Sequence, residues 1–98
     1  MLHIVNKSPF SSQALDSCVQ VAQGGDLILI EDGVYAASSG TVADRFMRDI
    51  VKRFRVYALR SDLEARGLAD RLVDGVTLVD YAGFVDLVVQ NKTCQSWL

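Results

Sequence analysis

The sequence predicts an α/β protein of three layers, in which a parallel β-sheet lies between helices. Four short, nearly continuous apolar runs are rich in branched residues, a pattern typical of strands buried on both faces. Segments with apolar residues at helical spacing separate these runs, so that strands and helices alternate strictly. Right-handed crossovers between such strands place helices on both faces of the sheet.

The expected strands differ in how continuous their apolar runs are. They span Leu2–Val5, Leu27–Ile30, Phe54–Leu59 and Val76–Val79. Arg55 interrupts the third run and Thr77 interrupts the fourth. We therefore expect the third and fourth strands to be less enclosed than the first two.

The first two expected helices follow the first and second strands. Apolar residues from Ala14 to Ala22 fall at helical spacing, with Ser11 or Ser12 as the N-cap. Gly24 and Gly25 are expected to stop this helix. The second helix is predicted by an apolar stripe over residues 42–51.

Capping signals mark the last two expected helices. Ser61 and Glu64 have the spacing of a capping box, and Gly67 is expected to end the short helix that they begin. Asp80 is the expected N-cap of the final helix. The apolar stripe of that helix consists of Tyr81, Phe84, Val85 and Val88.

Length and composition limit the possible functions. The 98 residues correspond to one domain, which we expect to span residues 1–98. The apolar residues make up 50% of the chain, and with the 7 glycines the share is about 57%, against roughly 45–50% in an average soluble domain. This excess predicts partner subunits. With 10 basic and 12 acidic residues, the net charge of −2 argues against direct binding of nucleic acid or anionic membranes.

The sequence predicts neither a membrane span nor a secretion signal. Even the longest uninterrupted apolar runs, such as Leu27–Ile30, are far shorter than the roughly 20 residues that cross a bilayer. The first residues, Met1–Lys7, lack the features of a signal peptide. We therefore expect a cytoplasmic protein whose two cysteines, Cys18 and Cys94, are reduced thiols. Because they lack C-x-x-C spacing, they make neither a zinc site nor a thioredoxin-type pair. The phosphate-binding patterns G-x-G-x-x-G and G-x-x-x-x-G-K-[ST] are also absent from the sequence, and no metal or cofactor is expected.

Polar residues at the carboxyl ends of the strands are the generic candidates for a site in a parallel sheet. Glu31 and Asp32 form an adjacent acid pair that could bind a metal or serve acid–base chemistry. The structural alternative is that Asp32 caps a turn and Gly33 supplies a special backbone angle. We favour this alternative because no histidine or third carboxylate is tied to the pair by spacing.

Three other polar groups are also interpreted structurally. His3 lies inside the first strand, where a packed or hydrogen-bonded role is the usual one, and no Ser-His-Asp arrangement can be argued from spacing. The segment Ser38–Thr41 is expected to be the solvated start of a helix. The basic group of Arg48, Lys52, Arg53 and Arg55 is balanced by nearby acids and is expected to be a charged helix face.

Cys18 is the candidate residue for chemistry. Its helical spacing with Leu15, Val19 and Ala22 places it on the buried side of its helix, where it could be a small core residue. The alternative is a sulfur-handling thiol, which needs access and a lowered pKa. Cys94 lies in a polar tail and is expected to be more exposed than Cys18. Three residues later, Trp97 needs an apolar partner in the core or on a neighbouring subunit.

Six segments spread over the whole chain resemble those of a known family. They are Met1–Phe10, Leu29–Ala37, Val56–Leu59, Asp62–Leu68, Val79–Leu87 and Gln95–Trp97. Together and in this order, they resemble the DsrH/TusB family of sulfur-relay proteins. The resemblance implies a fold of the DsrE/DsrF/DsrH type. It also implies assembly with two homologous partners into a heterohexamer that holds two copies of each subunit.

The resemblance further implies a role in moving sulfur. In the DsrEFH complex of sulfur-oxidising bacteria, sulfur passes as a cysteine persulfide toward DsrC. In the related TusBCD complex, it passes toward TusE and the 2-thiouridine of the tRNA wobble position. In both complexes the sulfur-carrying cysteine belongs to the DsrE or TusD subunit. The resemblance therefore implies an accessory, mainly structural subunit rather than a catalytic one, with Cys18 as an auxiliary thiol.

Two branches of the family remain open. Cys18 occupies a position in the first helix where DsrH-like chains tend to have a cysteine, and Asn6–Phe10 and Asp80–Leu87 are more similar to DsrH. We therefore expect a DsrH-type subunit with DsrE-like and DsrF-like partners and a DsrC-like acceptor. The alternative is a TusB-type subunit with a TusE-like acceptor. A third hypothesis, based on Glu31 and Asp32 alone, is a stand-alone domain that binds a small molecule.

Overall fold

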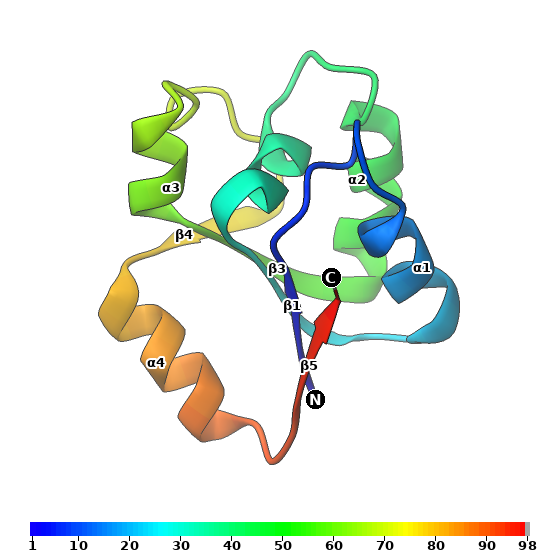
Figure 1. The fold of residues 1–98 in the computed structure, drawn as a ribbon, viewed down its shortest axis with the longest axis vertical. Helices are drawn as coiled ribbons and strands as arrows, with labels where there is room; N and C mark the ends of the chain where they lie inside the picture. The colour runs from blue at the N-terminus through cyan, green and yellow to red at the C-terminus, as the bar shows by residue number, and fades with distance from the viewer. Residues whose placement is uncertain (98) are drawn as a thin grey trace.

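A computed structural model describes residues 1–97 and contains a five-stranded, wholly parallel sheet with helices on both faces (Figure 1). The strands are β1 (Leu2–Val5), β2 (Gly25–Leu29), β3 (Phe54–Leu59), β4 (Val76–Val79) and β5 (Cys94–Trp97), and their order across the sheet is β4-β3-β2-β1-β5. The predicted three-layer α/β/α architecture is confirmed.

Strand order decides which face each helix covers. The helices are α1 (Ala14–Val21), α2 (Asp44–Arg53), α3 (Arg60–Ala65) and α4 (Tyr81–Gln90), and η1 (Glu31–Ala37) is a 3₁₀ helix. From β1 to β4 the chain steps in one direction across the sheet, so right-handed crossovers put α1, α2 and α3 on one face. The last connection runs back past β1 to β5, and α4 therefore lies on the opposite face (Figure 1).

The two faces of the sheet are covered unequally. The larger part of the core lies beneath α1, α2 and η1, and includes Val5, Leu29, Val34, Met47 and Ile50. The smaller part lies beneath α4. Its buried members are Leu2, Ile28 and Leu87, against which half-buried residues such as Ile4 and Tyr57 pack. One helix thus covers a sheet face that three helices and a 3₁₀ turn cover on the other side.

The four expected strands are all present, with small shifts. The second begins at Gly25 and ends at Leu29. Gly25, which was expected only to stop the preceding helix, is thus the first residue of a strand. The third and fourth strands are less enclosed, as expected, and Arg55 and Thr77 are exposed. The sequence did not predict β5, because its residues Cys94–Ser96 are polar or small and exposed at the edge of the sheet.

The sequence predicted the N-cap of α4 correctly and the N-cap of α3 wrongly. The Asp80 carboxylate accepts a hydrogen bond from the Gly83 N–H at 2.8 Å and caps α4. The Ser61–Glu64 capping box does not form. The strand β3 runs directly into α3, whose N-cap residue is Leu59, so Ser61 already lies inside the helix. At α1 the N-cap residue is Gln13, although the Ser12 hydroxyl accepts a hydrogen bond from the Ala14 N–H.

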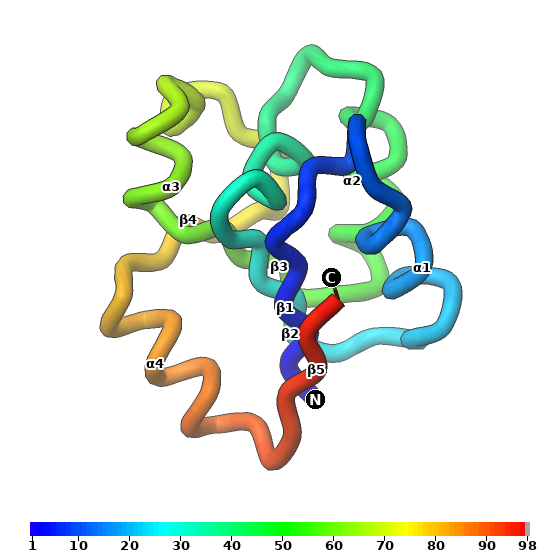
Figure 2. The backbone as a smooth tube through the Cα atoms, in the orientation of Figure 1, coloured from blue at the N-terminus to red at the C-terminus, as the bar shows by residue number. Residues whose placement is uncertain are grey.

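The backbone path is visible as a tube in Figure 2, where the first and last strands lie side by side. Leu2 pairs with Cys94 and Val5 pairs with Trp97, so the two ends of the described chain are neighbours in the sheet. Within residues 1–97, none of the helices is both long enough and apolar enough to pass through a membrane.

Candidate functional site

Cys18 lies on the inner side of α1 and is fully buried in the core. Its neighbours in the core cluster include Leu15, Val19 and Leu29. Burial raises the pKa of the Cys18 thiol to about 11. The thiol is therefore protonated at neutral pH, whereas a reactive cysteine is a thiolate in a polar, accessible place. A sulfur-carrying role for Cys18 stays a prediction, and it would require this part of the chain to open.

Cys94 is in the opposite situation. It is an exposed free thiol at the start of the edge strand β5, beside Leu2 of β1. The position therefore meets the accessibility that a reactive thiol needs. Among residues 1–97, no group of three or more histidine, cysteine or acidic side chains is arranged to hold a metal ion.

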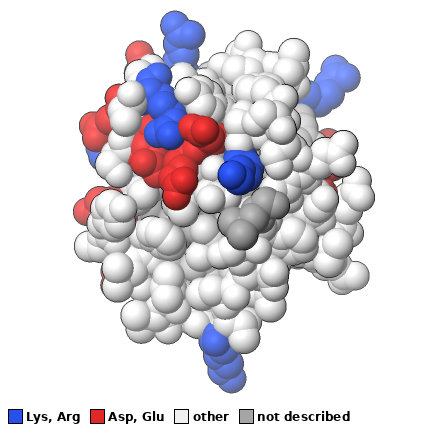
Figure 3. Space-filling view, in the orientation of Figure 1, with Lys and Arg blue, Asp and Glu red and all other residues white. Residues whose placement is uncertain are grey.

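The acid pair at the end of β2 is tied into contacts with α3. The backbone of Glu31 has a φ of +49°, and its N–H donates a hydrogen bond to Asp62 Oδ2 at 2.6 Å. Asp32 Oδ1 accepts from Arg66 Nη2 at 2.8 Å, and the Arg66 guanidinium also lies 5.8 Å from the centre of the Tyr35 ring. On the face seen in Figure 3, acidic side chains gather beside basic ones. These contacts favour the structural interpretation of the pair.

Two details of that interpretation are wrong. Asp32 does not cap the turn, because it lies inside η1, whose N-cap residue is Ile30, and its carboxylate binds Arg66. Gly33 is needed for close packing rather than for a special backbone angle, since the positive φ belongs to Glu31. A Cβ atom at Gly33 would collide with the backbone carbonyl of Val5.

His3 and Trp97 form a contact within the chain. The Trp97 indole N–H donates a hydrogen bond to His3 Nδ1 at 3.2 Å, and the rings of His3 and Phe54 form a T-shaped pair with their centroids 6.1 Å apart. Burial lowers the pKa of His3, and the nearby N-terminal amine lowers it further, against a hydrogen bond to the backbone of Gly24. His3 is a packed, hydrogen-bonded residue as expected, and Trp97 finds its apolar partner inside the chain.

The expected charged face and helix start also have structural partners. The Arg48 guanidinium lies 2.6 Å from the Asp44 carboxylate, and Arg55 lies 2.5 Å from Asp26. Arg53 donates to the Val19 carbonyl at 2.7 Å and so joins α2 to α1. Near the start of α2, the Thr41 hydroxyl accepts a hydrogen bond from the Ala43 N–H. These basic residues therefore serve the fold.

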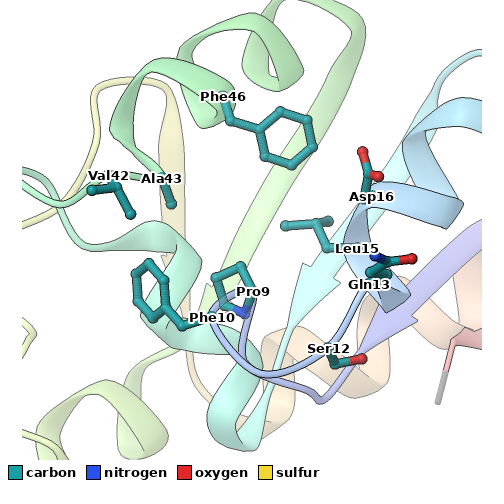
Figure 4. A pocket seen from close by; sticks show the side chains of 9 residues that line it. All are labelled: Pro9, Phe10, Ser12, Gln13, Leu15, Asp16, Val42, Ala43 and Phe46. Carbon is teal, nitrogen blue, oxygen red and sulfur yellow. The ribbon is translucent and has the colours of Figure 1, made fainter.

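An apolar groove lies between the first turns of α1 and α2, near the carboxyl ends of the strands (Figure 4). Its volume is about 330 Å³. The residues that line it are Pro9, Phe10, Ser12, Gln13, Leu15, Asp16, Val42, Ala43 and Phe46. Leu15 and Phe46 face one another across it, and the one ionisable side chain among these residues is Asp16. The groove can therefore take an apolar group but offers little acid–base chemistry.

The second apolar surface is the outward side of α4, which the sequence did not assign correctly. The apolar stripe that the sequence predicted for this helix consists of Tyr81, Phe84, Val85 and Val88. Of these, Phe84 is half-buried against the sheet beside the buried Leu87, while Tyr81 and Val85 are 68% and 56% exposed. Because α4 is apolar on almost every side, its sequence alone could not show which side the sheet would cover.

Comparisons with known proteins identify relatives over the full chain. The sequence model of a family described as "DsrH like protein" matches residues 7–94. Protein TusB of Pectobacterium parmentieri is 37% identical over 98 residues, which cover 99% of this chain and 100% of that protein. Protein TusB of Escherichia coli strain K12 is 34% identical with the same coverage.

Two solved structures share the fold. The ychN protein from E. coli has a TM-score of 0.81 at 16% identity, with 97% of each chain covered. A protein of unknown function from Methanobacterium thermoautotrophicum has a TM-score of 0.71 at 17% identity, with 97% of this chain and 95% of that chain covered. At these identities the likeness concerns the fold alone.

Proposed function

The chain belongs to the DsrH-like family, and we propose that it is a TusB-type subunit of a cytoplasmic sulfur relay. In such a relay, sulfur passes between proteins as a cysteine persulfide and is delivered for 2-thiolation of the tRNA wobble uridine. The observation that carries this proposal is the 37% and 34% identity, over the full chain, to proteins named TusB. These relatives favour the TusB branch over the DsrH branch that the segment comparison favoured.

We assign the chain an accessory role within that relay. The thiol of Cys18 is buried and protonated, which is unfavourable for accepting sulfur from a partner. The net charge of −2 gives no reason for the subunit to hold tRNA itself. The partners would then be subunits of the TusC and TusD type, with the sulfur-carrying cysteine on the TusD-type partner and a TusE-like protein as acceptor.

The surfaces of the chain support a subunit role. The groove between α1 and α2 and the outer side of α4 are both apolar, and they lie on opposite faces of the sheet. Large apolar side chains such as Phe10 and Tyr81 are more than half exposed on them. Exposed apolar patches on both faces are expected of a subunit that contacts more than one neighbour.

Deletion of the gene in its host tests the proposal. We expect 2-thiouridine to disappear from the wobble position, as measured by mass spectrometry of digested tRNA, and to return when the full chain is supplied on a plasmid. Purification of the tagged chain, followed by native mass spectrometry, should give an assembly with two kinds of small partner.

Normal 2-thiouridine after the deletion would contradict the TusB-type role. If sulfur oxidation fails in that strain while thiolation is normal, the result favours the DsrH-type subunit of a DsrEFH complex, for which Cys18 in the first helix was the argument. A chain that purifies alone as a stable monomer would contradict both subunit roles.

A further inference from the structure

The outer side of α4 is apolar and has no cover within residues 1–97. Tyr81, Val85, Val88 and Val89 stand at positions i, i+4, i+7 and i+8, so they share one side of the helix. Val89 is 77% exposed, whereas Leu87 on the opposite side of the helix is buried against the sheet. A helix that is apolar on both sides is normally buried on both sides.

A shallow groove of about 200 Å³ lies on this side of the helix, lined by Tyr81, Phe84, Val85 and Val88. Because a cavity of roughly 150 Å³ accepts a benzene-sized group, the groove has room for an apolar side chain from another molecule. The charged Asp86 stands on the flank of the helix, away from the middle of the apolar side. A second helix could therefore lie on this side without burying an unpaired charge.

The exposed charges at the two ends of α4 have opposite signs. Asp80 precedes the first turn, and Lys92 follows two residues after the last helical residue. When a second α4 lies antiparallel across the first, the Lys92 of each chain comes near the Asp80 of the other. The two helix dipoles then also attract one another. The surface is thus complementary to itself, as an interface around a two-fold axis must be.

From these observations we propose that the outer side of α4 binds the α4 of a second copy of this chain, antiparallel, around a two-fold axis near Val85. Tyr81 of each copy then packs near Val89 of the other, and the Val85 side chains meet at the axis. The inference rests on the proposed function in one respect: a relay assembly with two copies of each subunit contains two such faces. Self-association of the chain can be measured without any relay activity.

Sedimentation of the purified full chain tests the pairing. The chain should dimerise in the micromolar range, and Val85→Glu should raise the dissociation constant at least about tenfold, because it buries an unpaired charge at the axis. The matched control is Val21→Glu on α1, since Val21 is 71% exposed on the other face of the sheet, and this variant should dimerise normally. Lys92→Glu should weaken the dimer because it places two acids together.

Cross-linking gives a second measurement that does not depend on a disruptive variant. In a Cys94→Ser background, Val85→Cys should form a disulfide-linked dimer on mild oxidation, because the two thiols face each other at the axis. Val21→Cys in the same background is the control and should remain uncross-linked. The experiment is done with the purified chain and with the chain in extracts of its host, where its natural partners are present.

A cross-link through position 85 in either sample, together with a weakened dimer for Val85→Glu, supports the inference. Absence of the cross-link in both samples overturns it. Capture of a different small subunit through position 85, without self-linking, also overturns it, because the occupant is then another chain. The test of the proposed function, loss of 2-thiouridine in the deletion strain, does not depend on how α4 pairs. Failure of this inference can therefore be distinguished from failure of the proposed function.

Discussion

Burial sets the chemistry of single residues in this protein, and Cys18 is the clearest case. With a pKa of about 11, only about one thiol in ten thousand is ionised at pH 7. The helical spacing was enough to place Cys18 on the buried side of its helix. The spacing could not show the pKa, because that depends on how completely the folded core buries the thiol.

The contrast between the two cysteines predicts a simple count of reactive thiols. In the native chain, a thiol-specific reagent should modify Cys94 quickly and Cys18 only after denaturant is added. Mass spectrometry of the modified chain, with Cys94→Ser as the control, measures both. Rapid native labelling of Cys18 would show that α1 opens, which a sulfur-handling Cys18 would require.

His3 predicts how stability depends on pH. Its pKa is lowered from 6.5, first by burial, so the folded chain binds this proton less readily than the unfolded chain. The contribution of His3 to the free energy of unfolding is therefore fully present above pH 6.5. It decreases as the pH falls through the pKa that His3 has in the folded chain. Unfolding by urea at several pH values, followed by the emission of Trp97, measures this effect, because the chain has one histidine and one tryptophan.

His3→Gln is the control for that titration. Glutamine does not ionise in this range, so the slope of the free energy of unfolding between pH 7.5 and 5.5 should become flatter (roughly the range in which histidine titrates). An unchanged slope in His3→Gln would assign the effect to another group.

At the scale of single elements, capping distinguishes α4 from α3. Asp80→Ala should lower the free energy of unfolding by about 1 kcal/mol, because the Gly83 N–H loses its hydrogen-bond partner. Ser61→Ala should change it by less than about 0.5 kcal/mol, because Ser61 lies inside α3 and is not its N-cap. Chemical denaturation of both variants measures the difference. If both variants lose the same free energy of unfolding, Ser61 caps α3 after all, as the sequence predicted.

The elements also show what the sequence could and could not predict. Buried strands such as β1 and β3 follow from their apolar runs, since burial on both faces demands such runs. The edge strand β5 carries no such signal, because half of its backbone and most of its side chains face water. The correct side of α4 was equally hidden, since apolar residues stand on almost every side of this helix.

At the scale of the whole molecule, the sequence predicted the three layers because strict alternation of strands and helices leaves few other arrangements. It did not predict that the last connection returns to the opposite edge, which leaves α4 alone on its face. The two apolar surfaces described above also lie on different faces of the sheet. The groove of Figure 4 lies over the well-covered face, and the outer side of α4 lies over the other.

The pairing of β1 with β5 has a consequence for the order of folding. Leu2 and Cys94 are neighbours in the sheet but lie at opposite ends of the sequence, so bringing them together closes the longest loop in the fold. Pairings such as β1 with β2 span far fewer residues and form sooner. Until β5 arrives, β1 is an unprotected edge on which a strand of another molecule could add. Slow folding should therefore leave this chain open to aggregation through β1. Pairing with the four residues of β5 covers that edge and ends the exposure.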